Sequence, residues 1–373
     1  MTSSQVLGVL PNMVISTCFQ AAWEKFFRYF DVEARFCKPL LKDHFKVNAE
    51  SLAAMCDEKT IGVVGILGNH YNGAYDPIWE IDKAIGKLNS ERGYQIGIHV
   101  DAASGGFIAP FQDGIPPFDF RLENVLSISA SGHKFGESVC GTGWVVFRHR
   151  ENLAEHIAIS VSYLGGHCDS MTLNFSRPAT AAYVQYYKFL RLGLEGYKQK
   201  VDNQMLVSKF LRDRLKSMTF TDGRPRFHML DDGDTYCLPV VGASLNFDGG
   251  ISYTDIDLQH ALAESHWYVS GYNLSFDDFT KNGKLEPLLL DMPPDASMFR
   301  VVVKSNLTMS LAEDLADHID KVIPMMDSMK DGYHSLHSET KKQKSAAHWA
   351  TAKQGVLKAI ASRSSISQPH AAC

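Results

Sequence analysis

The sequence has 373 residues, 45% hydrophobic and 21% charged, so it is long enough to bury a large core and to form two domains. Its net charge of −5 excludes a whole-chain basic surface of the kind that binds nucleic acid. Seven cysteines without a Cys-x-x-Cys pair predict neither a disulfide framework nor a metal site, and no apolar run or basic leader predicts a membrane span or a secretory signal. We therefore expect a cytoplasmic protein.

Short apolar runs alternate with helical patterns, which predicts an α/β protein with a largely parallel sheet. In chain order, the patterns predict a helix at Phe19–Phe30, a strand at Thr60–Leu67, a helix at Pro77–Glu91, strands at Gln95–Val100, Val125–Ala130 and Gly143–Phe147, a helical stretch at Arg177–Leu215, strands at Tyr236–Asn246 and Met298–Lys304, and a helix at Ser310–Met329. We place a domain boundary inside the long helical stretch, so that a large domain covers 1–200 and a smaller one 201–330.

The tail, residues 331–373, has its own composition, rich in Ser, Ala, Lys and His. Trp349, Val356 and Ile360 fall on one helical face, with lysines around them. A basic amphipathic helix of this kind binds calmodulin or an anionic membrane surface. A disordered, solvated tail is the alternative that we favour.

Two residues with reactive side chains follow predicted strands. Asp101 ends the strand QIGIHV and precedes the small residues AASGG, and Lys134 stands in Ser-Gly-His-Lys directly after SISAS. Taken singly, such an aspartate often only caps a turn, and such a lysine is usually a solvated surface residue. Because ligands gather at the carboxyl ends of strands in open α/β sheets, we expect the two side chains to lie close together.

This pair meets the needs of a pyridoxal-phosphate (PLP) enzyme. A lysine amine forms a Schiff base with the cofactor aldehyde. A carboxylate at the ring nitrogen keeps it protonated, so that the ring can accept electrons from a breaking bond. We therefore predict Asp101 at the ring nitrogen and Lys134 at the aldehyde. Ser131 and His133 fit a tight loop near the phosphate, and an ordinary structural role is the alternative for His133.

The motifs around this pair resemble those of the glutamate decarboxylases of bacteria, plants and fungi. The matching segments are FQAAWEKFFRYFDVEAR from Phe19, HVDAASGGFIAPF from His99, SISASGHKFG from Ser127, GTGWVVFR from Gly141, VSYLGGH from Val161 and LNFSRPA from Leu173. The resemblance implies a PLP-dependent transferase-like fold (fold-type I), with a large, mostly parallel domain and a smaller C-terminal α/β domain. It also implies decarboxylation of an amino acid, L-glutamate giving 4-aminobutanoate and CO2.

The resemblance also implies roles for individual residues. At the cofactor ring, Gln20 would stack on the open face, Ala103 would pack against it, Asp101 would pair with the ring nitrogen and His70 would lie beside the cofactor. Near the phosphate would lie Ser131 and His133, while Ser176 would reach the phosphate of the neighbouring subunit. Lys134 would form the Schiff base, and Arg300 would hold a substrate carboxylate. The role of Ser176 implies a homodimer, and a guanidinium suits bidentate carboxylate binding.

Three features depart from the family pattern. The chain has no segment with a phosphate-binding loop before the helix at Phe19, so the resemblance implies an N-terminally truncated member. His70 stands where the family usually has threonine, and the segment Val301–Thr308 is less charged than its family counterpart. Two alternatives therefore stay open: an inactive paralogue that binds a family partner, and a decarboxylase of another acidic amino acid. Retention of the cofactor and substrate residues favours the active enzyme.

Overall fold

The computed structural model describes residues 10–329 except 163, 164, 167, 173, 175, 232, 234 and 235, so the tail and its calmodulin-binding prediction lie outside it. The strands are β1 (Asn12–Ser16), β2 (Glu33–Cys37), β3 (Thr60–Ile66), β4 (Gly97–Asp101), β5 (Val125–Ser131), β6 (Gly143–Phe147), β7 (Ile159–Val161), β8 (Cys168–Ser170), β9 (Phe227–Met229), β10 (Val240–Leu245), β11 (Ser270–Asn273), β12 (Ser275–Asp278), β13 (Lys284–Pro287) and β14 (Ser297–Val302). The α-helices are α2 (Ala21–Phe30), α3 (Ala49–Ala54), α4 (Ile78–Arg92), α5 (Thr180–Ser217), α6 (Asp255–Ala263) and α7 (Met309–Met329).

Over the described residues, the larger sheet has six strands in the order β2-β1-β3-β4-β5-β6. The first five are parallel, and β6 pairs with β5 in the antiparallel sense at one edge. Helices cover both faces, as a buried parallel sheet requires. Val63 packs with the α4 residues Ile78 and Ile81, whereas Val64 packs with Phe27 of α2. Because successive strand residues point to opposite faces, α2 and α4 lie on opposite sides of the sheet.

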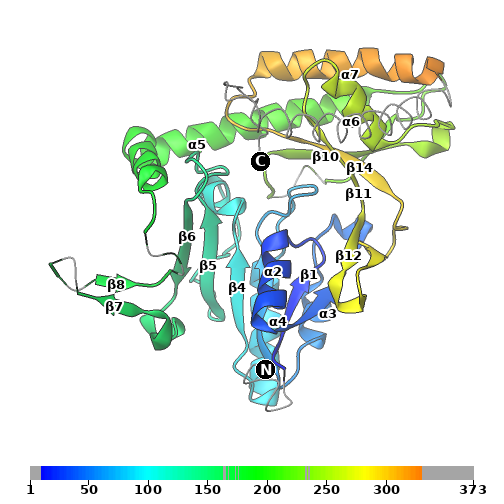
Figure 1. Ribbon diagram of the computed structural model, residues 1–373. Helices are drawn as coiled ribbons and strands as arrows, with labels where there is room; N and C mark the ends of the chain where they lie inside the picture. The colour runs from blue at the N-terminus through cyan, green and yellow to red at the C-terminus, as the bar shows by residue number, and fades with distance from the viewer. Residues whose placement is uncertain are drawn as a thin grey trace, which may run out of the picture.

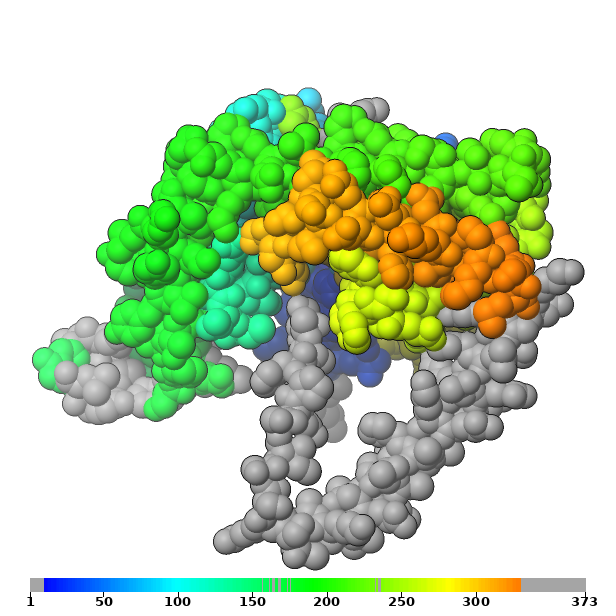
Figure 2. All heavy atoms as spheres, turned by 90° about the horizontal axis from the view of Figure 1, so that it is seen from above, coloured from blue at the N-terminus to red at the C-terminus, as the bar shows by residue number. Residues whose placement is uncertain are grey.

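A second layer of structure lies above this sheet. Its sheet has the order β11-β14-β10-β9 with antiparallel pairing, and helices α5, α6 and α7 lie around it (Figure 1). Helix α7 lies alongside α5 across the top of the molecule (Figure 2), where Arg214 of α5 reaches Asp317 at 2.8 Å and Asp320 at 2.9 Å. Buried side chains therefore cluster on both faces of the larger sheet and, separately, beside the smaller sheet.

Helix α5 contributes to the buried clusters of both sheets. Val201 is buried with the residues of the larger sheet, while Val207 and Leu211 are buried with the smaller one. The helix is kinked at Gly193, whose φ of 58° lies in the left-handed region that glycine adopts without strain. The domain boundary near residue 200 falls inside this shared helix and stays a prediction.

The predicted fold class, α/β with a mostly parallel sheet, is confirmed, and each predicted helix and strand has a counterpart within a few residues. Strands β1 and β2 were not predicted, nor was α6. The two strands have five residues each, the same length as β4 and β6, which were predicted, so length alone does not explain why they were missed. Helix α6 is short, and it begins at a capping box in which Thr254 and Asp257 exchange hydrogen bonds.

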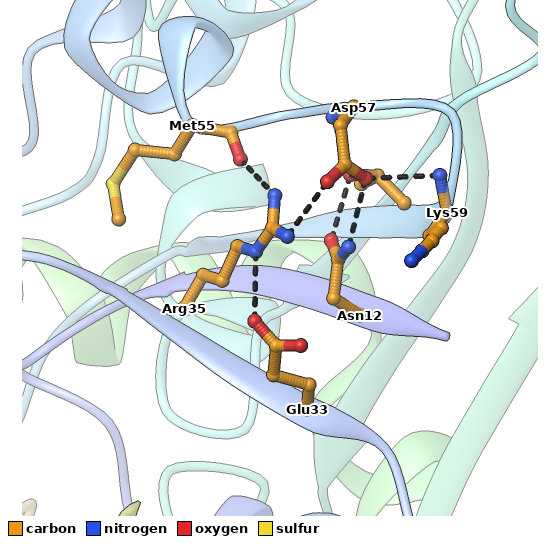
Figure 3. Close-up of polar contacts among 7 residues, drawn as sticks. Asn12, Glu33, Arg35, Met55, Asp57 and Lys59 are labelled. Atoms are coloured by element: carbon orange, nitrogen blue, oxygen red, sulfur yellow. Dashed lines mark hydrogen bonds and ion pairs between the residues drawn. The ribbon is translucent and has the colours of Figure 1, made fainter. Parts of the chain in front are cut away.

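The amino end of β1 is fixed by an ionic network (Figure 3). Asp57 accepts from Asn12 Nδ2 at 2.8 Å and from Arg35 Nη2 at 2.7 Å, and Arg35 also donates to Glu33 Oε1 at 3.1 Å and to the Met55 carbonyl at 2.8 Å. The network therefore joins β1, β2 and the loop before β3 at the edge opposite the strands' carboxyl ends. In this described part of the chain, no helix has both the length and the apolar content needed to cross a bilayer.

Candidate active site

The carboxyl ends of three adjacent parallel strands carry the predicted site residues. Asp101 is the last residue of β4, Ser131 is the last of β5, and His70 lies in the loop after β3. The loops are tied together by the backbone, because Ser131 donates its N–H to the Ala103 carbonyl at 3.1 Å and Gly105 donates to the Leu67 carbonyl at 3.0 Å. The parallel register thus gathers residues that are far apart in the sequence.

Both carboxylate oxygens of Asp101 accept hydrogen bonds. Oδ1 accepts from the Ala103 backbone N–H at 3.1 Å, and Oδ2 accepts from Trp23 Nε1 at 2.7 Å. Trp23 belongs to α2, so this bond joins the helix to the strand end. Sequence reasoning missed Trp23, although it lies within the aromatic helix that carried the family resemblance.

Lys134 follows β5 and points back toward the end of β4. Its Nζ donates to Ser104 Oγ at 3.3 Å, and Ser104 is a second residue that sequence reasoning missed. Burial lowers the pKa of Lys134, Asp101 opposes that shift, and Arg300 adds to it. A lowered pKa increases the neutral fraction of the amine, which is the nucleophilic form.

The loop that carries Lys134 is held against α5. A Cβ on Gly136 would lie 2.7 Å from the Gly132 carbonyl, so the loop is too tight for a side chain there. The Gly136 carbonyl accepts from Gln185 Nε2 at 3.0 Å and from the Tyr197 hydroxyl at 3.1 Å. These bonds fix the backbone on which Lys134 stands.

His70 and Arg300 complete the buried side of the site. Burial, Arg300 and Lys134 together lower the pKa of His70 to about 3, so the imidazole is neutral at ordinary pH. Arg300, on β14, lies with its guanidinium carbon 5.1 Å from the centre of the Tyr272 ring. His70 Nδ1 and Arg300 Nε are both buried without a hydrogen-bond partner. Two unsatisfied polar atoms in one region indicate a place for a polar ligand.

The other predicted residues differ in exposure. Ala103 and Ser131 are partly buried at the strand ends, whereas Gln20, His133 and Ser176 are exposed. Gln20 is the residue that precedes the first turn of α2, and His133 Nδ1 lies 3.4 Å from the Thr142 carbonyl. Ser176 lies between β8 and α5. Electrostatic interactions thus link Lys134 to Asp101 and Arg300, and they link His70 to Arg300 and Lys134.

Residues 2–232 match the family model described as the pyridoxal-dependent decarboxylase conserved domain. The chain belongs to this family, and membership implies pyridoxal phosphate as the cofactor and amino-acid decarboxylation as the reaction class.

Within this family, the chain is similar to several glutamate decarboxylases. The chain is 37% identical to "Glutamate decarboxylase beta" of Listeria innocua, over 91% of this chain and 67% of the relative. It is 36% identical to "Glutamate decarboxylase" of Lactococcus lactis, over 87% of this chain and 64% of the relative. The solved structure of Lactobacillus brevis glutamate decarboxylase superposes with a TM-score of 0.76 at 34% identity, over 87% of this chain and 69% of that one. The chain therefore spans about two thirds of the length of the relatives it matches.

The described residues fit PLP. The cofactor needs an amine for its aldehyde, a carboxylate for its ring nitrogen and polar donors around it. Lys134 is a partly buried amine with a lowered pKa, and the donors to Asp101 are both uncharged N–H groups. Because neither donor is a cation, neither competes with a protonated ring nitrogen for the Asp101 carboxylate.

Proposed function

We propose that this chain decarboxylates L-glutamate to 4-aminobutanoate and CO2 with PLP bound at Lys134. The observation that carries the proposal is the 3.3 Å contact of Lys134 Nζ with Ser104 Oγ, which holds the lysine amine beside the end of β4, where Asp101 lies. The identities of 34–37% to glutamate decarboxylases support glutamate as the substrate. The cysteine content, in turn, favours the cytoplasm as the compartment.

When bound, PLP supplies a ring that accepts the electron pair of the breaking carbon–carbon bond. Asp101 would hold the proton on the ring nitrogen, and its two N–H donors keep the carboxylate in place for that task. The Lys134 amine would anchor the cofactor and exchange with the substrate amine. Because its pKa is lowered, it needs less free energy to lose its proton first.

The remaining site residues would position the cofactor and the substrate. Gln20 would cover the open ring face and Ala103 would pack against the ring. Ser131 and His133 would bind near the phosphate. Their positions at the end of β5 and in the next turn support this assignment.

Arg300 would bind a substrate carboxylate through its guanidinium. Its unpartnered Nε supports this role, because a buried donor without a partner is costly until a ligand binds. His70 would contribute a neutral imidazole beside the cofactor. Since the imidazole does not compete as a cation, the positive charge facing the substrate belongs to Arg300 and Lys134.

We propose a homodimer as the working form. Apolar side chains are exposed along β6 and the first half of α5, and the ring of Trp144 lies 5.8 Å from that of Phe189, so the two elements meet at this contact. The exposed residues are Trp144, Val145, Val146, Tyr183, Tyr187, Leu190 and Leu194. Exposed apolar side chains gathered on two neighbouring elements support a protein interface. Ser176 lies just before α5 in the chain, which suits a residue that reaches the neighbouring subunit's phosphate.

The test is an absorbance spectrum of the purified chain with added PLP, followed by dialysis. We expect a visible band that survives dialysis, disappears in Lys134→Ala and persists in Lys87→Ala, a matched change at an exposed lysine on α4. Release of CO2 is then measured with glutamate and with aspartate, and sedimentation gives the oligomeric state.

The outcomes of these measurements distinguish three functions of the chain. A Lys134-dependent band with glutamate turnover supports the proposal. A band with faster aspartate turnover would instead support a decarboxylase of another acidic amino acid. Loss of the band from the wild-type chain would leave the inactive paralogue that binds a family partner.

A further inference from the structure

Trp23 is the side chain that joins helix α2 to the carboxylate of Asp101. Its indole Nε1 donates to Asp101 Oδ2 over 2.7 Å, a short distance for an N–H donor. The residues are far apart in the sequence, so the bond is a tertiary contact and no part of a local turn. Hydrogen bonds in which the acceptor is charged are stronger than neutral ones.

A second residue of β4 holds the indole in place. His99 lies two positions before Asp101, so its side chain points to the same face of the sheet. The His99 and Trp23 rings meet edge to face, with centroids 5.5 Å apart. His99 itself is fixed, because its Nδ1 lies 2.7 Å from Ser127 Oγ and its Nε2 lies 3.1 Å from Ser129 Oγ.

The two side chains that hold the Asp101 carboxylate, Trp23 and His99, are electrically neutral. Burial lowers the pKa of His99, although Asp101 acts in the opposite direction, and the indole carries no charge. Trp23 and His99 therefore orient the carboxylate without cancelling its charge. A lysine or arginine in the same place would form an ion pair with Asp101 and compete with any other cation.

We infer that Trp23 is a positioning residue that holds the Asp101 carboxylate in the orientation needed to pair with the ring nitrogen of PLP. The inference rests on the proposed function and extends it from the carboxylate to the helix. Gln20 directly precedes the same helix, so the bond also links the residue proposed for the ring face to the residue proposed for the ring nitrogen.

The first measurement uses the chain without cofactor. The indole N–H resonances of the chain labelled with ¹⁵N-tryptophan are compared with those of Trp23→Phe, which identifies the Trp23 signal by its loss. We expect that signal to move upfield in Asp101→Ala, because the hydrogen bond has been removed. Trp79 is the internal control, since it lines a separate cavity of about 530 Å³ with Tyr75 and Tyr236. An unmoved Trp23 signal would overturn the inference, and this result would not depend on whether the chain binds PLP.

The second measurement is the dissociation constant of PLP, taken from the Lys134-dependent band. Trp23→Phe keeps an aromatic ring and removes only the donor, and we expect it to weaken PLP binding by about tenfold, the effect of one hydrogen bond to a charged group. The control Trp79→Phe is expected to bind PLP as the wild type does.

A double-mutant cycle separates positioning from general support of the fold. If Trp23 acts through Asp101, Trp23→Phe adds no further loss of affinity in the Asp101→Ala background. Additive losses, or unchanged affinity in Trp23→Phe alone, would overturn the positioning role and leave the proposed function standing. A wild-type chain with no Lys134-dependent band would overturn the proposed function, while the NMR comparison still decides whether the bond exists.

Discussion

Glu137 accepts hydrogen bonds of 2.6 Å at both carboxylate oxygens from Lys200 Nζ, and Lys188 Nζ donates to the same carboxylate at 3.0 Å. Both lysines belong to α5, and Glu137 follows Lys134 in the same loop. The Glu137 φ of 61° lies in the left-handed region, which is unfavourable for a residue with a side chain. The ion pairs therefore hold a strained backbone directly beside the proposed cofactor lysine.

Glu137→Ala is expected to destabilise the chain by about 1–3 kcal/mol, because two partly buried lysines lose their partner and the strain remains. Glu137→Gly is expected to lose less, since glycine adopts this φ freely. Urea unfolding of both variants measures the difference. Equal losses in the two variants would show that the strain contributes nothing.

The lowered pKa of His70 predicts that the free energy of unfolding falls in acid. Its folded-state pKa is lowered from 6.5 to about 3, so below pH 6.5 the unfolded chain binds a proton that the folded chain does not. Stability contributed by the neutral imidazole is therefore present above pH 6.5 and is lost as the pH falls toward 3. Between pH 6.5 and pH 5 the loss is about 2 kcal/mol.

His70→Thr is expected to remove this part of the pH dependence. The measurement is the free energy of unfolding in urea at both pH values. His228→Gln, at an exposed histidine on β9, is the matched control and should behave as the wild type does. A wild-type difference that persists unchanged in His70→Thr would contradict the assignment.

The smaller core contains a buried ion pair. Arg212 on α5 donates to Asp231, the two side chains are 5% and 3% exposed, and Asp231 also accepts from the Gly242 backbone N–H at 2.9 Å. Asp231→Asn is expected to destabilise the fold by about 3–5 kcal/mol, because it leaves a buried guanidinium without a counter-charge.

The double variant Arg212→Met, Asp231→Asn is expected to recover part of that loss, since the uncompensated charge is gone. Thermal unfolding of both variants checks the ordering. A double variant less stable than Asp231→Asn alone would show that the packing of the Arg212 side chain contributes more to stability than its charge does.

The network around Asp57 predicts a second acid-sensitive contribution. The Asn12 hydrogen bond lowers the Asp57 pKa, burial opposes the shift, and Arg35 adds to the lowering. Because the folded pKa is depressed, this stability is present above the unfolded pKa of about 4 and is lost as the pH falls below it. Asp57→Asn should lose stability at neutral pH and show a smaller fall in melting temperature between about pH 5 and about pH 3 than the wild type.

The sequence predicted the larger sheet well where periodicity was strong. In the run Thr60–Leu67, Val63 and Val64 are fully buried on opposite faces of the sheet, and α4 repeats isoleucine at Ile78, Ile81 and Ile85, all fully buried. Short strands such as β12 and β13 have four residues each and carry no such signal. Their pairing depends on contacts with distant segments, which local patterns do not encode.

The candidate site divides in the same way. Asp101 and Lys134 were predictable, because strand ends and motif spacing carry their signal. Trp23 and Ser104 were not, because only the packing of α2 over β4, and the close approach of the loops after β4 and β5, bring them to those residues. The unpaired state of Arg300 Nε is likewise a property of burial.

Helix α5 binds the short loop at Gly136 and Glu137 through residues on both sides of its kink. Gln185 and Lys188 precede Gly193, whereas Tyr197 and Lys200 follow it, and all four bind Gly136 or Glu137. Each added residue turns an α-helix by about 100°. A single insertion between these contacts would swing half of them away from the loop. Evolution of this chain can therefore vary the identity of the residues around the kink far more freely than the number of residues it spans.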